Sequence, residues 1–231
     1  MPTLVIGNKC HSSWSLRPWI LLKQFGIPFE EVLIPFADPI DSPEWKAEVR
    51  RYSPAAKVPA LVDGHVAVWE SLAIMEYLAE SHPDLAIWPR DRAARAMARS
   101  IAAEMHAGFS ALRSACPMNL GKKYPERDRG LAVAKDVGRI VEIWTAARER
   151  FGPGGPFLFG SFTAADAMFA PVVTRFETYS IGTEPVCRAY MDAVIATPAF
   201  QAWRAAALAE TWFVPEDEVD EEPIQVFRGA A

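Results

Sequence analysis

"KVPALVDGHVAVWESLAIMEYL", residues 57–78, is the stretch that decides the fold. Two short apolar runs flank Asp63 and Gly64, a pair that strongly favours a tight turn between antiparallel strands. From Glu70 and Ser71 onward, the apolar residues recur at the spacing of an amphipathic helix. The stretch therefore predicts a β-hairpin that is followed directly by a helix.

The residues before this hairpin alternate strand-like and helix-like segments. "TLVIG", residues 3–7, is short and β-branched, which is typical of a buried strand. A helix-like spacing follows over about residues 15–25, and residues 29–36 indicate a second strand. A short polar helix is predicted at residues 43–52. We therefore expect an α/β domain over residues 1–81.

The remaining chain has a different, helical pattern. Residues 82–90 contain two prolines and interrupt the alternation, so we take them as a linker. Residues 91–212 are predicted to form an all-α domain, and residues 213–231 an acidic tail. Within the tail, residues 215–223 are predicted to be a solvated arm without strands. The helices of this domain are expected at about residues 91–115, 125–151, 164–178, 184–196 and 198–209.

Composition excludes several classes of function. The chain has 231 residues and a net charge of −5, without the basic cluster that a nucleic-acid partner requires. No apolar run reaches the ~20 residues of a membrane span. The three cysteines, Cys10, Cys116 and Cys187, have no CxxC spacing, which favours a reducing, cytoplasmic compartment. The four histidines show no metal-binding spacing, so no metal is expected.

One residue pair near the end of the helical pattern has two interpretations. Thr163 precedes a predicted helix, and Asp166 follows three residues later, which resembles a capping box. Asp166 is either a catalytic acid or a cap that stabilises the first turn. We favour the cap, because the dipole of a helix stabilises a carboxylate at this position.

Two serines lie between the first strand and the first helix. Ser12 or Ser13 serves as a plain N-cap, which contributes roughly 1 kcal/mol, or its hydroxyl points at a ligand. The N-terminus of a helix favours negative charge, because its backbone N–H groups and its dipole point toward the ligand. The residues of this segment alone leave both interpretations open.

Two further segments are expected at the same edge of the domain. Proline cannot donate to a β-ladder, so Pro59 marks a strand start, an edge or a cis bond that exposes the backbone of Val58 to an extended peptide. At the next helix N-terminus, Ser71 is suited to a carboxylate and Glu70 to an ammonium. A carboxylate and an ammonium on one carbon, a peptide bond and a thiol together describe γ-glutamyl-cysteinyl-glycine, which is glutathione.

Four segments together resemble the glutathione S-transferase family, and the order of elements agrees up to about residue 212. The opening of the first helix is most similar to the zeta class, also called maleylacetoacetate isomerase, whose motif is Ser-Ser-Cys-Ser with an arginine two places on. The segments are "SSWSLRPWILL" (12–22), "KVPALVDG" (57–64), "ESLAIMEYL" (70–78) and "FTAADAMFAP" (162–171).

The resemblance implies a thioredoxin-like first domain, an all-α second domain, glutathione as co-substrate and a homodimer. Ser12, with Ser13 as the alternative, would donate its hydroxyl to the glutathione sulfur. A free thiol has a pKa of ~8.5, and such a donor together with the helix N-terminus is expected to lower it by about 2 units in a site shielded from water. The residues implied to hold glutathione are Trp14, Lys57, Val58, Pro59, Glu70 and Ser71.

The sequence departs from the zeta pattern at two places. Trp14 replaces the cysteine of the motif, and Cys10 is either a displaced thiol or a small buried apolar residue. Counting from Asp166, Glu177 falls where the family has its substrate-binding arginine, and Arg175 lies two residues earlier. Because two residues rotate a helix by ~200°, Arg175 is not expected to replace that arginine.

An acceptor site is expected between the domains, on the helix that begins at residue 91. Its apolar residues recur at i, i+4 and i+7, a stripe that belongs to the core or lines a pocket for an apolar electrophile. Trp14 and Trp212 are candidates for aromatic walls. The predicted pocket residues are Met105, His106, Phe109, Leu112 and Arg113.

Four functions remain open on these residues. The first is conjugation of glutathione to a small hydrophobic electrophile, and the second is a glutathione-dependent isomerase. The third is a non-catalytic binding protein that keeps the fold. The fourth, a glutaredoxin-like reductase, needs a cysteine at the helix start, where the chain has Trp14.

Overall fold

The computed structural model describes residues 1–36, 39–40 and 42–228. A four-stranded sheet in the order β2-β1-β3-β4 forms the first domain. Strand β1 runs parallel to β2 and antiparallel to β3, and β3 and β4 form the predicted hairpin. The strands are β1 (Thr3–Ile6), β2 (Glu30–Leu33), β3 (Ala60–Asp63) and β4 (Val66–Trp69).

Three helices cover this sheet: α1 (Ser13–Gln24), α2 (Pro43–Val49) and α3 (Ser71–Ser81). Alternate residues of β1 point to opposite faces, as the pleat of a strand requires. Leu4 and Ile6 belong to the main core with α1 and α3, whereas Val5 packs with Trp45 of α2. The sheet is therefore enclosed between two helical layers, as in a thioredoxin-like domain, which confirms the expected fold class.

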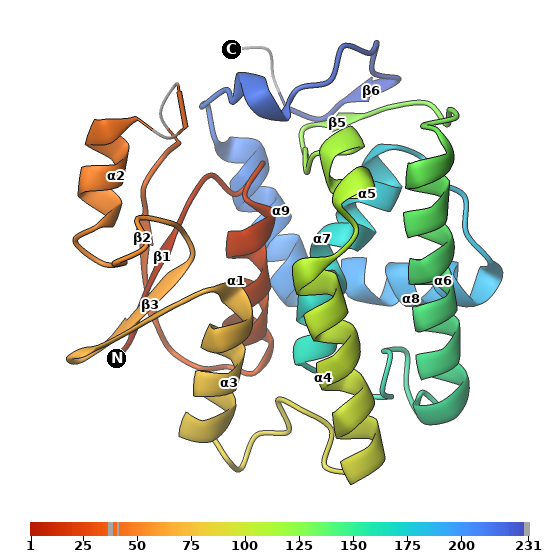
Figure 1. Cartoon of the computed structure of the whole chain (residues 1–231), viewed down its shortest axis with the longest axis horizontal. Coiled ribbons are helices and arrows are strands. Elements are labelled where there is room, and N and C mark those ends of the chain that lie inside the picture. The colour runs from red at the N-terminus through yellow and green to blue at the C-terminus, as the bar shows by residue number, and fades with distance from the viewer. Residues whose placement is uncertain (37–38, 41, 229–231) are drawn as a thin grey trace.

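The second domain is all-helical and shares its core with the first (Figure 1). Helix α7 is buried along almost its whole length and packs against α1. Within the described part of the chain, no helix combines the length and the apolar character needed to span a membrane. The helices are α4 (Arg92–Ala107), α5 (Ser110–Ala115), α6 (Leu131–Phe151), α7 (Ala164–Thr178), α8 (Pro185–Ile195) and α9 (Pro198–Ala209).

The long helix predicted over residues 91–115 is wrong, because the chain breaks it at Gly108 and Phe109. Phe109 adopts the left-handed conformation, with φ of 58°, and Gly108 packs so tightly that a Cβ there would lie 2.7 Å from the carbonyl oxygen of Glu104. Only glycine fits such a close approach. The break gives α5 a direction of its own.

The tail is not the solvated arm that the sequence predicted, although residues 215–223 form no strand, as expected. Residues 213–228, which we call the C-terminal arm, contain a short 3₁₀ helix, η1 (Pro215–Asp217), and a strand, β6 (Gln225–Val226). Strand β6 pairs antiparallel with β5 (Lys122–Lys123), along the top of Figure 1. The acidic residues of the arm pair with bases of the helical domain, which lowers the charge repulsion that would otherwise keep it extended: Glu218 with Lys122, and Glu221 with Arg129.

The capping box predicted at α7 is confirmed. The backbone N–H of Thr163 donates to Asp166 at 2.8 Å, and its hydroxyl donates to the same oxygen at 2.9 Å. The other carboxylate oxygen accepts from the N–H of Leu158 at 3.1 Å. Burial raises the pKa of Asp166 to about 6, so the carboxylate is charged at neutral pH. Its oxygens bind the loop before α7 to the helix, which is a structural role.

Candidate active site

Two adjoining cavities lie where the domains meet. The interdomain cavity, of about 550 Å³, is lined by the start of α1, by Lys57 and Val58, by α5 and by the C-terminal arm. The side cavity, of about 280 Å³, shares Trp14, Lys57, Val58 and Arg113 with it and adds Pro59, Trp69 and Glu70. The volumes suit a tripeptide and a small second molecule.

Both serines at the start of α1 line the interdomain cavity. Ser12 is the N-cap, since its Oγ accepts from the N–H of Ser15 at 3.4 Å, and it also donates to Ser15 Oγ at 2.7 Å. Ser15 Oγ in turn accepts from the N–H of Gly7 at 3.1 Å. Ser12 is thus both a cap and a cavity residue, so the two interpretations of its hydroxyl are compatible.

Val58 offers its main chain to the cavities. The Val58–Pro59 bond is cis, one of the three possibilities raised by the sequence. Among the described residues, the backbone N–H and C=O of Val58 have no hydrogen-bond partner. Unpaired backbone groups at a cavity wall suit an extended peptide, which binds like an added strand.

Glu70 and Ser71, at the start of α3, differ in their access to the side cavity. Glu70 lines it and has a φ of 71°, and its carboxylate lies 3.7 Å from His106 Nε2. Burial lowers the pKa of His106, so this contact is not an ion pair at neutral pH. Ser71 is fully buried, and its hydroxyl faces the sulfur of Met168 at 4.0 Å. Only its backbone N–H is left for a ligand at this helix N-terminus.

Trp14 lies between two guanidinium groups. Arg17 stacks 4.1 Å from the ring centre and Arg113 4.6 Å from it. Arg17 is almost fully buried, donates through Nε to the carbonyl of Met168, and has no partner for one terminal nitrogen. Burial, together with Arg175 and Arg113, lowers its pKa. Of the two arginines that stack on Trp14, Arg113 lines both cavities, whereas Arg17 lies buried against Trp14 and lines neither.

Arg175 completes this group, against the expectation from the sequence. It lines the interdomain cavity and is held by the carbonyls of Cys116 and Pro171, at 2.8 and 3.1 Å. Burial lowers its pKa to about 10, which leaves it cationic at neutral pH. Glu177, which the register placed at the site, instead pairs with Arg188. Of the two residues, Arg175 therefore lines the interdomain cavity, although the rotation argument gave no reason to expect it there.

The predicted acceptor stripe is core. Met105 and Leu112 are fully buried and Phe109 nearly so, and all three belong to the main hydrophobic core. The break before α5 removes the single helix face on which they were aligned. Trp212 also lies apart, beside Lys9 at the surface. Of the predicted acceptor residues, Arg113 lines both cavities and His106 contacts Trp14 and Glu70.

His11 and Asp217 are cavity residues that sequence reasoning missed. Their nearest atoms, Nδ1 and Oδ2, are 4.0 Å apart. Burial lowers the pKa of His11 to about 4, so His11 is neutral at pH 7 and the pair is not a salt bridge. Asp217 comes from the C-terminal arm, whose acidic composition gave no sign that one of its carboxylates enters a cavity.

The Asp217 carboxyl makes stability depend on pH. Burial raises its pKa from 3.8 to about 6. Because the folded state binds this proton more tightly than the unfolded state, the contribution to stability is complete below pH ~4 and is lost as the pH rises through ~6. Relative to wild type, Asp217→Asn is therefore expected to gain roughly 2 kcal/mol in free energy of unfolding between pH 4 and pH 7.

Urea unfolding of both proteins across this pH range measures the effect. Asp220→Asn, at an exposed position of the same arm, is the matched control and is expected to follow wild type at every pH. A constant difference between Asp217→Asn and wild type would contradict the raised pKa.

Comparison with known proteins agrees with this geometry. Residues 11–81 match the family model "Glutathione S-transferase, N-terminal domain", and residues 130–206 match "Glutathione S-transferase, C-terminal domain". The chain belongs to the glutathione S-transferase family. A probable maleylacetoacetate isomerase of Caenorhabditis elegans is 32% identical over 187 residues, which cover 80% of this chain and 83% of the relative. A zeta-class glutathione S-transferase of Euphorbia esula is 28% identical over 76% of this chain and 78% of its own.

Solved glutathione S-transferases share the fold. A glutathione transferase homologue from Burkholderia gl BGR1, with bound glutathione, has a TM-score of 0.65 at 24% identity and covers 90% of this chain and 99% of its own. A theta-class glutathione S-transferase from Xanthomonas axonopodis pv. citri, also with glutathione bound, has a TM-score of 0.60 at 22% identity, over 87% and 95% of the two chains. These likenesses extend over both domains.

In this member of the glutathione S-transferase family, Trp14 occupies the position of the zeta-class motif cysteine, and Cys10 does not supply a thiol in its place. Cys10 is buried in the main core, and burial raises the pKa of its thiol. A reactive cysteine needs a lowered pKa and access to the ligand. Of the two interpretations of Cys10, the structure therefore supports a small buried apolar residue and not a displaced reactive thiol.

Proposed function

We propose that the chain binds glutathione across the side and interdomain cavities and adds its thiolate to an electrophile in the interdomain cavity. One observation carries this proposal. A capping hydroxyl at Ser12, the unpaired backbone of Val58 and the carboxylate of Glu70 line two adjoining cavities, and these are the groups that a thiol, a peptide bond and an ammonium require.

The γ-glutamyl end is assigned to the side cavity. Glu70 is suited to its ammonium, and the first N–H groups of α3, including that of Ser71, are suited to its carboxylate. The cysteinyl unit pairs with Val58, and Lys57 lies beside it for the glycine carboxylate. This order places the thiol toward the interdomain cavity and Ser12.

The serine pair at the start of α1 supplies a hydroxyl to the thiolate. A hydroxyl donates one hydrogen bond and accepts others, so the hydrogen bond between Ser12 and Ser15 can reverse its direction when glutathione binds. Ser15 then donates to Ser12, and Ser12 donates to the sulfur, while the N–H of Gly7 still donates to Ser15. Cations that line the cavity favour the thiolate as well. The thiol releases its proton to solvent, and the thiolate sulfur then attacks the electrophilic carbon, so that an aryl halide loses its halide ion as the C–S bond forms. Ser12 keeps its own proton throughout.

The arginines favour a second function, a glutathione-dependent isomerase. The expected apolar electrophile does not account for Arg113 and Arg175 in the cavity wall, whereas an acceptor with carboxylates does. The relatives named maleylacetoacetate isomerase agree with such an acceptor. In this reaction, glutathione adds to the acceptor, a bond rotates, and glutathione leaves again. The homodimer and the cytoplasmic location stay predictions.

Arg113→Gln is expected to discriminate between anionic and neutral acceptors. A hydrogen bond to a charged group contributes roughly 1.5–3 kcal/mol, so kcat/KM for 4-chloro-3,5-dinitrobenzoate is expected to fall roughly 10- to 100-fold. The neutral 1-chloro-2,4-dinitrobenzene reacts by the same chemistry and is expected to change much less. Steady-state kinetics with both substrates measures this difference.

Arg92→Gln removes the same charge at an exposed position outside both cavities and is the matched control. Equal losses for both acceptors in Arg113→Gln would show that this arginine does not recognise the carboxylate. A loss of glutathione affinity would assign Arg113 to glutathione instead.

Glutathione calorimetry beside conjugation assays tests the proposal as a whole. Binding with turnover of an aryl halide supports conjugation. Binding without such turnover, but with cis–trans isomerisation of an unsaturated dicarboxylate, supports the isomerase. Absence of glutathione binding would overturn both and leave the fold to another use.

A further inference from the structure

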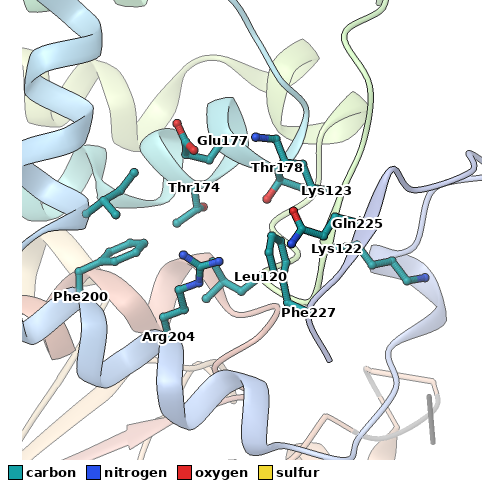
Figure 2. A pocket seen from close by; sticks show the side chains of 11 residues that line it. Leu120, Lys122, Lys123, Thr174, Glu177, Thr178, Phe200, Arg204, Gln225 and Phe227 are labelled. Atoms are coloured by element: carbon teal, nitrogen blue, oxygen red, sulfur yellow. The ribbon is translucent and has the colours of Figure 1, made fainter. Parts of the chain in front are cut away.

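A third cavity lies beside α7 and shares no lining residue with the cavities of the proposed active site. Figure 2 shows the side chains that line it. It has a volume of about 120 Å³ and is enclosed by α7, α9, β5 and the C-terminal arm, and we call it the arm cavity. Thr174 and Thr178 of α7 line it, whereas Arg175, between them in sequence, lines the interdomain cavity. The two cavities are therefore separate.

The walls of the arm cavity are largely apolar. Leu120, Ile195, Phe200 and Phe227 come from four different segments and surround it. An apolar cavity of roughly 150 Å³ is known to hold a benzene molecule. At about 120 Å³ the arm cavity is somewhat smaller, so a short branched chain or a single ring is the largest apolar group that we assign to it.

The second feature of the arm cavity is positive charge that is not paired with a carboxylate. Lys122 is turned outward in Figure 2 and pairs with Glu218, and Glu177 pairs with Arg188. Within the described ranges, no ion pair involves the other two cations, Arg204 and Lys123.

Arg204 is positioned for a ligand. It stacks on Phe227 at 4.9 Å from the ring centre and extends from α9 toward Leu120 (Figure 2). A guanidinium that is held by stacking and lacks an anion matches a carboxylate in a bidentate geometry. The apolar walls and this cation together favour a molecule with both an apolar and an anionic part.

We propose that the arm cavity binds a small organic carboxylate, with its ring or branched chain against the apolar walls and its carboxylate on Arg204. Gln225 and Phe227 belong to the arm, so the ligand bridges the arm and α9. Two backbone hydrogen bonds hold the arm to β5 and the residue before it. The N–H of Ile224 donates to the carbonyl of Lys123, and the N–H of Phe227 donates to the carbonyl of Gly121. Binding thus protects these amides from exchange with solvent.

Benzoate is the probe, titrated into the full-length protein by calorimetry with glutathione present at saturation. Wild type is expected to bind benzoate at millimolar concentrations, and Arg204→Gln to bind it at least about tenfold more weakly, or about 1.4 kcal/mol. Arg150→Gln is the matched control, because Arg150 also stacks on a phenylalanine, Phe151, but lies outside the cavity. Its affinity is expected to equal that of wild type.

Three outcomes would overturn the proposal. They are no binding of benzoate to wild type, equal binding to wild type and Arg204→Gln, and competition between benzoate and glutathione, which would place benzoate among the arginines of the interdomain cavity. Benzyl alcohol and acetate are expected to bind more weakly, since each lacks one half of the recognised chemistry. Slower hydrogen exchange at Ile224 and Phe227 with benzoate supports the assigned position, and unchanged exchange contradicts it.

Discussion

Ser12→Ala is expected to lower kcat for glutathione conjugation by roughly 10- to 100-fold while glutathione affinity is nearly retained. A pKa lowered by about 2 units corresponds to roughly 2.7 kcal/mol of selective stabilisation of the thiolate, and the hydroxyl of Ser12 supplies part of it. The ultraviolet absorbance of the bound thiolate, followed against pH, measures the pKa directly. Calorimetry measures the affinity.

Three companion variants make this test specific. Ser13→Ala changes the neighbouring cavity hydroxyl and is expected to have little effect, and Ser12→Thr, which keeps a hydroxyl, is expected to recover much of the rate. Ser15→Ala removes the group that orients Ser12 and is expected to raise the thiol pKa by less than Ser12→Ala does. A loss confined to Ser13→Ala would move the catalytic role to that residue. Thermal unfolding separates these effects from the roughly 1 kcal/mol that an N-cap contributes.

Asp166→Ala is expected to destabilise the fold by about 3 kcal/mol or more. Its carboxylate accepts hydrogen bonds from the N–H of Leu158 and from both the N–H and the hydroxyl of Thr163. Alanine leaves these donors buried without partners, at a cost of about 1–3 kcal/mol for each that water does not reach. Urea unfolding at neutral pH measures the loss.

Asp192→Ala is the control for this prediction, because Asp192 is exposed and pairs only with Arg188 on the same helix. An exposed pair of this kind contributes at most about 0.5 kcal/mol. Asp166→Asn keeps one acceptor oxygen and is expected to lose less than Asp166→Ala. If Asp166→Ala folds as stably as wild type but loses turnover, Asp166 has the catalytic role that we set aside.

The sequence predicted the elements whose signals are local. The Asp63–Gly64 turn, the start of α3 at Ser71 and the bounds of α7 and α9 follow from turn chemistry, capping and apolar period, and the structure agrees with them. Short-range signals such as these depend on neighbours within a few residues. They also located Ser12 and Val58, because both lie where an element begins.

Features that depend on distant contacts were not predictable in this way. The apolar period of residues 91–115 continues across Gly108, and only the packing of Glu104 and the left-handed Phe109 end α4 there. The acidic arm looked solvated, because its partners, Lys122 and Arg129, lie about ninety residues earlier in the chain. Arg175 is held at the interdomain cavity in part by the carbonyl of Cys116, which lies 59 residues earlier and which no count along α7 reveals.

The break before α5 separates most of the residues on the acceptor side from those assigned to glutathione; Arg113, which lines both cavities, is an exception. Glutathione is assigned to residues 12–71, whereas Ser110, Ser114 and Met118, just beyond the break, line only the acceptor side. Because Gly108 and Phe109 end α4 before these residues, we expect that substitutions at Ser110, Ser114 and Met118 change acceptor preference with little effect on glutathione affinity. Acceptor preference is thus open to change at these positions without altering the residues assigned to glutathione.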